Sequence, residues 1–489
     1  MTSTPIRSVE DLRGADLPRL ILRDLTGRSH LQFDALDPAL RLIHTVVLKE
    51  RYRLGEPDAN GVAPLLLDET PAPLNDEDLP HDGNPALTIR EESDLAPYKP
   101  MCDVLVVGSA HAPEATPVSS FVARLRVFEP KPMDATSTSG PREPMSARDA
   151  FNVLIDKQVR VHGPRWWMRR STDGDGRDTR GARSSGPDEW MLSAAEPIER
   201  CALRYENGFG GQARIDVGSP FAGDVPARHH LRPEQLAAHP DAQADAPQRP
   251  LAHEASRFNP AGRGFTREWF LQATKLDRLP AHQIELAHQP VTVDDFWHVA
   301  AGRESLETVG LGPLERGWAP RVGWIGRETP DPAHVAAGLA LNPDFDFRYW
   351  NCAPADQQCR PLRGGERIVL DNLWPRAHPA ARQVQGGHRM TMFELPDRGF
   401  VLMGIDAAGD VRCFDPVIDT VLIDSDEGVV DLCWRWSIGA HHGLEEARLM
   451  EAKTPGQRAR LAELRAVMSR PIDVPDAEPH AGLNSEPVA

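Results

Sequence analysis

The stretch Val430-Asp-Leu-Cys-Trp-Arg-Trp-Ser-Ile438 alternates large apolar side chains with polar or smaller ones. Successive side chains of a β-strand point to opposite faces, so this period of two predicts a strand with one apolar face. The same alternation runs from Phe151 to Val161, and further β-type runs occur at 42–48, 104–107, 121–128, 401–405 and 417–423. We therefore predict a mainly β fold, a large antiparallel β-sandwich-like body made of two packed lobes.

A short helical element is expected near the end of the chain. Thr454-Pro-Gly-Gln457 offers an N-cap threonine, a first-turn proline and a glutamine three residues later, as in a capping box. Apolar Leu461, Leu464 and Met468 follow at helical spacing, before Pro471. The preceding segment, 444–453, is interpreted as another short helix. These helices either pack on the β body, which we favour, or form a docking element for a partner.

The expected organisation follows from these patterns. A β-rich body spans residues 20–440, its two lobes dividing near 206–265, and is followed by C-terminal helices over 441–470 and a disordered tail over 471–489. Three segments without periodicity are rich in Pro, Gly, Ser, Asp or Ala and are predicted to be mobile inserts: 132–148, 171–189 and 221–257.

Composition narrows the classes of function. The 489 residues carry a formal net charge of −17, and an acidic surface repels nucleic acid and anionic lipid. No signal peptide and no long apolar run is recognisable, so we expect a cytoplasmic protein without membrane insertion. Six cysteines lie far apart, without a Cys-x-x-Cys motif, and are expected to be reduced, buried thiols rather than zinc ligands or disulfides. No metal or cofactor is expected.

Carboxylates offer the main candidates for catalysis. Asp344 and Asp346 would share one face of an extended segment, where they could act as an acid and a base, but Arg348 continues that face and would neutralise them. A hydrolase or lyase built on Glu206, Asp344 and Asp346 with nearby arginines is therefore the alternative from the enzyme class. No nucleophile with an adjacent base accompanies these residues, and no Gly-x-Ser-x-Gly, P-loop or dinucleotide-binding motif is complete.

Several stretches, taken in order over about residues 40 to 440, resemble one bacterial family. They are Asp94-Leu-Ala-Pro-Tyr-Lys-Pro-Met-Cys-Asp-Val-Leu-Val-Val-Gly108, Arg204-Tyr-Glu-Asn-Gly-Phe-Gly-Gly211, Asn259-Pro-Ala-Gly-Arg-Gly-Phe265, Trp318-Ala-Pro-Arg321, Pro343-Asp-Phe-Asp-Phe-Arg-Tyr-Trp-Asn-Cys-Ala-Pro-Ala-Asp-Gln357, Gly364-Gly-Glu366, Asp419-Thr-Val-Leu-Ile-Asp424 and Trp434-Arg435. The family resembled is that of type VI secretion accessory proteins, a domain of unknown function encoded beside PAAR-like proteins. The chain departs from the family pattern at Gly163-Pro164-Arg165-Trp166 and at Gly323-Trp-Ile-Gly326.

The resemblance implies a non-enzymatic adaptor or chaperone that binds a PAAR-like effector and assists its loading onto the VgrG spike. Contact with VgrG itself, and export of the protein as a structural part, remain open alternatives. A chaperone of this kind should expose a patch of apolar and Arg side chains to its partner.

Nine residues of these motifs are the candidate site residues, and each either pins a loop or contacts the partner: Glu206, Asn259, Arg263, Arg321, Asp344, Asp346, Arg348, Asp356 and Gln357.

Overall fold

The computed structural model describes residues 20–38, 41–114, 116–131, 151–170, 186–326, 344–384 and 386–468. Strands account for 40% of the structure and helices for 16%, which confirms the prediction of a mainly β fold with a C-terminal helix. The predicted tail, 471–489, the predicted insert 132–148 and residues 171–185 of the insert predicted over 171–189 lie outside the described residues. The last residues of that insert include a 3-10 helix, Pro187–Glu189.

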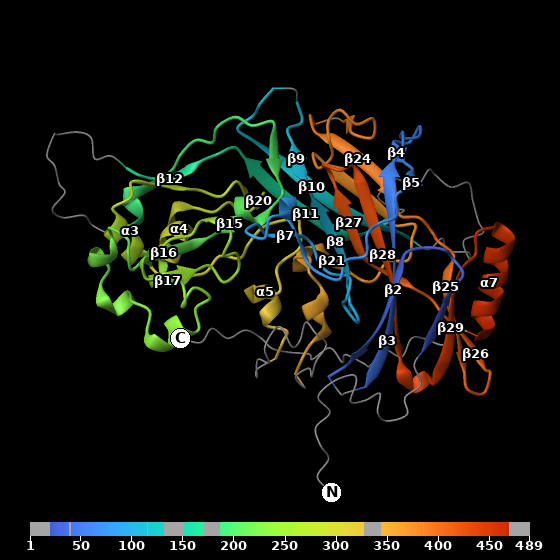
Figure 1. The fold of residues 1–489 in the computed structure, drawn as a ribbon. Helices are drawn as coiled ribbons and strands as arrows, with labels where there is room; N and C mark the ends of the chain where they lie inside the picture. Colours follow the sequence, from blue (N-terminus) through green and yellow to red (C-terminus); the bar gives the residue numbers. More distant parts are fainter. Residues whose placement is uncertain are drawn as a thin grey trace, which may run out of the picture.

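Three large sheets form the body of the molecule (Figure 1). The first, in spatial order, consists of β2 (His30–Leu36), β3 (Leu42–Leu54), β28 (Val429–Gly439), β27 (Val417–Asp424), β8 (Cys102–Val107) and β21 (Gln358–Cys359), with β5 (Leu65–Leu67) on β3. The second consists of β20 (Ile284–Leu286), β11 (Phe151–His162), β10 (Ser120–Pro130), β22 (Arg367–Asp371), β24 (Arg389–Glu394) and β23 (Arg382–Gln383), with β4 (Val62–Ala63) on β24. The third consists of β1 (Ile21–Asp24), β29 (Leu444–Glu451), β25 (Phe400–Asp406) and β26 (Val411–Phe414).

Most pairs in these sheets are antiparallel, as expected, but the sheets are mixed. Strands β1 and β29, β8 and β27, and β4 and β24 pair in parallel, and so do the short strands β15 (Phe209–Gly210) and β18 (Arg263–Gly264). The apolar faces of the three large sheets meet in one core cluster, to which Leu48, Val104, Val161, Ile368 and Leu449 belong. This shared core is why the strands fold as one body rather than as separate hairpins.

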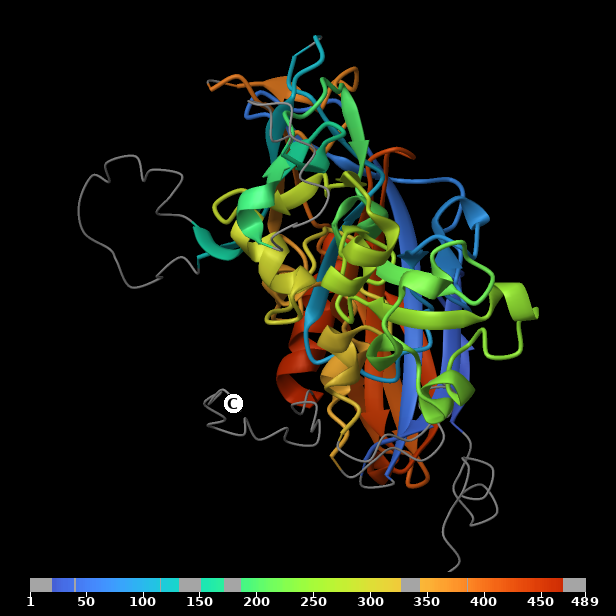
Figure 2. The same ribbon diagram turned by 90° about the vertical axis from the view of Figure 1, so that its left-hand side faces the viewer.

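Residues between 166 and 300 form smaller sheets and two hydrophobic clusters of their own. Figure 2 shows the green and yellow-green part of this region in front of the long strands of the body. Its strands, besides β15 and β18, are β12 (Trp166–Arg169), β13 (Trp190–Leu192), β16 (Gln212–Asp216), β17 (Pro250–Ala255) and β19 (Arg278–Pro280); its α-helices are α2 (Pro233–Ala237), α3 (Glu268–Thr274) and α4 (Val293–Ala300). The division into two lobes stays a prediction.

The remaining elements are short, apart from the last helix. They are β6 (Leu79–Pro80), β7 (Ile89–Glu91), β9 (Ser109–His111), β14 (Arg200–Ala202), α5 (Ala319–Val322), α7 (Pro455–Met468) and the 3-10 helices η1 (His81–Gly83), η2 (Pro187–Glu189), η3 (Tyr205–Asn207), η4 (Ala222–Asp224), η5 (Ala227–His229), η6 (Ala246–Gln248), η7 (Phe347–Trp350), η8 (Ala355–Gln357) and η9 (Ala440–His442).

The helix predicted over 444–453 is wrong, because this segment is strand β29, which lies between β1 and β25. A β-bulge explains the misleading pattern. Ile405 pairs with Glu446 but Asp406 pairs with Leu444, so the extra residue brings Leu444 onto the same buried face as Ala447. Their spacing of three imitates one face of a helix. The helix predicted from Thr454 is confirmed as α7, and its Leu461 is buried against Val401 of the third sheet.

The mobile insert predicted over 221–257 is also wrong. This segment contains η4, η5, α2, η6 and β17, and β17 pairs with β16. Val225 and Ala252 are buried in a cluster with Trp269, so tertiary burial orders a segment whose local composition is typical of a loop.

In the described part of the chain, no helix is both long and apolar enough to cross a membrane.

Candidate functional site

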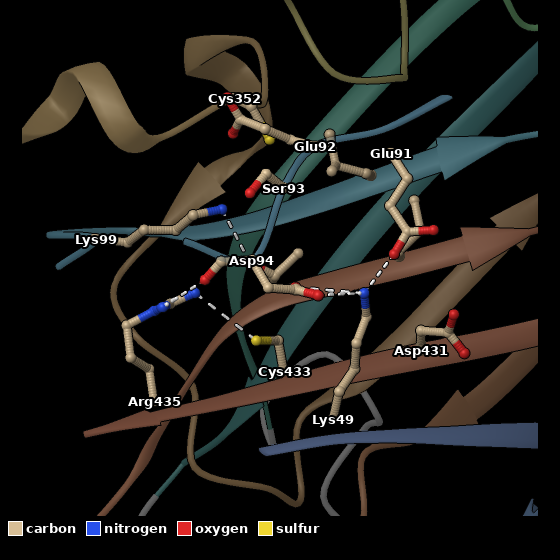
Figure 3. Close-up of a pocket in the computed structure, with 13 residues that line it drawn as sticks. Lys49, Glu91, Glu92, Ser93, Asp94, Lys99, Cys352, Asp431, Cys433 and Arg435 are labelled. Atoms are coloured by element: carbon tan, nitrogen blue, oxygen red, sulfur yellow. Dashed lines mark hydrogen bonds and ion pairs between the residues drawn. The ribbon is translucent and has the colours of Figure 1, made fainter. Parts of the chain in front are cut away.

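The first sheet has two faces with different chemistry. Alternate side chains of β3, β28, β27 and β8 enter the apolar core, and the others carry Lys49, Asp103, Asp431 and Arg435 on the opposite face. A polar sheet face normally meets water. Here the end of β7 with the segment that follows it, residues 91–99, and the loop 351–353 cover this face, and these four charged residues are at most 5% exposed. The result is a buried charge network, shown in Figure 3.

Lys49 lies at the centre of the network. Its ammonium group donates to both oxygens of Asp94, 3.0 and 3.3 Å away, and to Glu91. Burial by itself lowers the pKa of Lys49, but the charges of Asp94 and Glu91 outweigh burial and raise it above its usual value. Lys49 therefore stays charged, and it ties strand β3 to the covering segment.

Asp103 anchors the second covering loop. Its carboxylate accepts hydrogen bonds from Lys99 Nζ at 2.9 Å, from Asn351 Nδ2 at 3.1 Å and from the backbone N–H groups of Cys352 and Ala353 at 3.1 and 3.2 Å. A buried carboxylate is stable only when its oxygens are satisfied in this way. The side chain of Asp103 thus fixes the position of residues 351–353 over the sheet.

Arg435 closes the network on the other side. Its guanidinium forms an ion pair with Asp419 and donates to the backbone carbonyls of Asp94, 3.1 Å away, and Ala96. A planar guanidinium can bond to several acceptors at once, which suits it to hold a chain segment against a strand.

Glu92 connects the network to a candidate residue from the sequence, Arg321. The carboxylate lies 2.7 Å from Arg321 Nη2 and 2.8 Å from Arg316 Nε. Burial raises the pKa of Glu92, but the two guanidinium groups outweigh this effect and bring the pKa down to about 2. Arg321 is itself buried, and it donates to the backbone carbonyls of Leu314 and Tyr349. The contacts of Arg321 thus hold three parts of the chain together, at Glu92, Leu314 and Tyr349.

The cavity between these side chains measures about 20 Å³, room for one water molecule. Each charged side chain that lines it has an ion-pair partner: Lys49 with Glu91 and Asp94, Glu92 with Arg321, Lys99 with Asp103, Asp431 with Arg51, and Arg435 with Asp419. Burial raises the pKa of the lining thiols Cys352 and Cys433, so both are protonated. These ion pairs hold the covering segments, residues 91–99 and 351–353, against the first sheet.

Glu206, Asn259 and Arg263 meet at the parallel pair β15–β18. Asn259 Nδ2 donates to the carbonyls of Tyr205 and Phe209 at 2.8 and 3.1 Å, and Arg263 Nε donates to the carbonyl of Glu206 at 2.8 Å. The carboxylate of Glu206 accepts from the backbone N–H and the hydroxyl of Thr88.

The turn at β15 depends on a glycine beside Asn259. Gly210 has φ of 152°, and a Cβ atom at this position would lie 2.1 Å from the carbonyl oxygen of Asn259. Residues with a Cβ atom rarely adopt this positive φ, whereas glycine does so without strain. The close approach of the two backbones also excludes a larger residue.

Asp346 and Arg348 form an ion pair around η7, where Arg348 Nε lies 2.9 Å from Asp346 Oδ2. The guanidinium of Arg348 also stacks on Trp324, 3.7 Å from the ring centre. Asp344, two residues before Asp346 in the chain, is exposed. The three carboxylates of the enzyme alternative therefore have different surroundings: Glu206 binds Thr88, Asp346 binds Arg348, and Asp344 faces solvent.

Asp356 and Gln357 lie in η8 and share a partner, Lys157 of β11. The ammonium group donates to Asp356 Oδ1 at 2.7 Å and to Gln357 Oε1 at 2.9 Å. Gln357 also donates to the carbonyls of Val104 and Leu311, so its amide joins three segments. Half of the Asp356 side chain is exposed, at 51%, which leaves it accessible from outside.

Sequence reasoning missed most of the charge network as a site. A usable signal exists, because lysine is rare in this chain and Lys49, Lys99 and Lys157 stand in apolar or motif-rich segments where a charge must find a partner. Within the described residues, no three His, Cys, Asp or Glu side chains are grouped so that they could hold a metal ion.

The whole network, from Lys49 to Arg435, falls inside a family match that covers residues 40–435. The matching family is described as an uncharacterized protein conserved in bacteria, DUF2169. The chain belongs to the DUF2169 family. Comparisons with curated proteins and with solved structures give no match. The DUF2169 match begins just before β3 and ends in β28, so its two ends pair with each other in the first sheet.

Proposed function

We propose that this DUF2169 protein is a cytoplasmic, non-enzymatic accessory protein of type VI secretion. In this role it binds a PAAR-like effector as an adaptor or chaperone and assists the loading of that effector onto the VgrG spike. The proposal rests on the order of the family-like motifs along the chain.

The observation that carries the proposal over the hydrolase or lyase alternative is the pairing of the candidate charges. Glu206 and Asp346 are engaged by Thr88 and Arg348, and the cavity beside the charge network has room for one water. A catalytic acid and base need free access to a common substrate position. Residues that hold loops in place instead suit a protein that presents a shaped surface.

One surface fits the apolar and Arg patch expected of a chaperone. Met168 and Met191 lie directly opposite each other on β12 and β13 and are 37% and 42% exposed. Beside them, Arg278 of β19 stacks on Trp166, 4.8 Å from the ring centre. Flexible, polarisable methionines adapt to varied apolar partners. We place the effector contact on this face, at the end of the molecule away from α7 (Figure 1).

The test is co-expression of this protein with the PAAR-like protein encoded beside it, followed by pull-down and by a measurement of soluble effector. We expect the wild-type protein to raise the soluble yield and to be captured with the effector. The variant Met168→Ser/Met191→Ser should lose capture while its thermal midpoint stays unchanged. Capture by VgrG without the effector would identify direct contact with the spike.

Arg263 and Arg348 separate loop pinning from partner contact. Arg263→Ala removes a bond to a backbone carbonyl and should lower the thermal midpoint, whereas Arg348→Ala removes a pair that is 49% exposed on the Arg side and should leave it unchanged. Loss of capture in Arg348→Ala would then mark an interface.

If the wild-type protein neither binds the effector nor changes its solubility or secretion, the adaptor proposal is wrong. A substrate screen with Glu206→Gln and Asp346→Asn variants would then test the enzyme alternative. Recovery of the protein from culture supernatant together with the spike would instead indicate an exported structural part.

A further inference from the structure

Two cysteines far apart in the chain face each other in the first sheet. Cys102 of β8 and Cys359 of β21 are direct register partners in an antiparallel pair. Both side chains point into the shared apolar core, where they are 0% and 5% exposed. Both are free thiols in this structure.

The geometry of such a pair suits a disulfide. Residues directly opposite each other in antiparallel strands have Cα atoms about 4.5–5.5 Å apart. Disulfides join cysteines whose Cα atoms are about 4.4–6.8 Å apart. Register, shared face and burial thus bring the two thiols close to each other in the core.

We propose that Cys102 and Cys359 form an oxidisable site that becomes a disulfide on reaction with a peroxide. The terminal oxygen of hydrogen peroxide is transferred to the sulfur of Cys359, giving a sulfenic acid and one molecule of water. The sulfur of Cys102 then attacks the sulfur of Cys359, its proton leaves with the hydroxyl group as a second water, and the S–S bond forms. Two thiols are oxidised by two electrons in total, and the peroxide is reduced to two waters.

The position of Cys359 explains how an oxidant reaches a buried pair. Strand β21 has only two residues and lies at the edge of its sheet, next to β8. Short edge elements open locally at a much lower free energy than the whole fold. Burial raises the pKa of Cys102, so this thiol is protonated and reacts poorly with peroxide itself, which leaves Cys359 at the sheet edge as the first sulfur to be oxidised.

The disulfide would close the chain between residues 102 and 359. This loop contains the small sheets and the helices α2, α3, α4 and α5. A crosslink across so long a loop removes many conformations from the unfolded chain, so the oxidised protein resists unfolding more than the reduced protein. This inference is independent of the proposed function.

The test is peroxide treatment of the purified full-length protein, removal of peroxide, denaturation and alkylation of the remaining thiols. The reduced wild-type chain has six cysteines, so we expect alkylated thiols to fall from six to four. Peptide mapping without reductant should recover one crosslinked species that contains Cys102 and Cys359. The oxidised protein should also have a higher thermal midpoint, which returns to the reduced value with dithiothreitol.

Two variants decide the assignment. Cys359→Ala should retain all five of its thiols after peroxide. Cys201→Ala is the matched control, because Cys201 is buried in the same core but faces Ala110 across its strand pair, and this variant should fall from five thiols to three. Six alkylated thiols in treated wild type, or a crosslink between other cysteines, would overturn the proposal. The peptide map of the wild type decides the matter even if a variant fails to fold.

Discussion

The first and second sheets have the same alternation of apolar and charged side chains, yet their charged faces have different environments. On the first sheet, the Lys99–Asp103 and Arg435–Asp419 pairs are at most 5% exposed. On the second sheet, the cross-strand pairs of Arg124 with Asp156 and of Arg367 with Glu394 are 25–44% exposed. The difference comes from the chain that covers the first sheet. Strand periodicity determines which side chains share a face, and the connecting segments determine whether that face meets water.

The segments that cover the first sheet, residues 91–99 and 351–353, change how much an ion pair contributes to the free energy of unfolding. A partly exposed ion pair on a sheet face stabilises the fold only slightly, because water solvates each charge nearly as well when the partner is absent. A buried pair has lost that water, so removal of one partner leaves a charge without compensation. The two sheets of this protein therefore offer matched sites, one covered and one open, for the same substitution.

The largest effect is expected at the covered site. Lys49→Met keeps much of the aliphatic volume but leaves Glu91 and Asp94 buried without their shared cation. We expect the free energy of unfolding to fall by about 3–5 kcal/mol, measured by urea denaturation at neutral pH. Addition of Glu91→Gln to this variant should recover part of the loss, because one buried charge is then removed. A loss below about 1 kcal/mol for Lys49→Met would mean that water reaches the network.

An intermediate effect is expected at Glu92, and it depends on pH. The two arginines hold its pKa at about 2, below the 4.5 of an unperturbed Glu, so the folded state binds the proton less readily than the unfolded state. The resulting stabilisation, about 3 kcal/mol, is complete above pH 4.5 and is lost as the pH falls toward 2. Glu92→Gln should therefore be less stable than wild type at pH 7, and the difference should shrink with acidification. Urea denaturation between pH 7 and pH 3 measures the difference in free energy of unfolding between wild type and Glu92→Gln. A difference that does not change with pH would contradict the lowered pKa of Glu92.

Sequence periodicity was sufficient for the long strands. The predicted runs at 42–48, 104–107, 121–128, 401–405 and 417–423 all lie within strands, because long alternating segments bury one face wherever the fold places them. It failed where a tertiary feature changed the pattern. The bulge opposite Ile405 gave β29 a helical spacing, and burial against Trp269 ordered a segment with the composition of a loop.

The candidate site was only partly within reach of the sequence. The pair Asp346–Arg348 is local, and its residues are two positions apart. The contact between Lys49 and Asp94 joins residues 45 positions apart, and it exists only because residues 91–99 fold back over the sheet. Period-two reasoning places Lys49 on the polar face of β3 and would leave that face in water. No local sequence pattern predicts that residues 91–99 lie over this face.

The smallest effect is expected at the open site, and it completes the comparison. Arg124→Met on β10 is chemically similar to Lys49→Met on β3: each replaces a cation on the polar face of a central strand with a long apolar side chain. Arg124 lies next to Asp156, but the two side chains are 31% and 38% exposed, so Asp156 recovers water when the arginine is lost. We expect a loss below about 1 kcal/mol in the same urea experiment, and less at high salt. If Arg124→Met cost as much as Lys49→Met, the cover would not be the cause of the difference, and the stabilisation would have to come from cross-strand pairing itself, whatever its exposure.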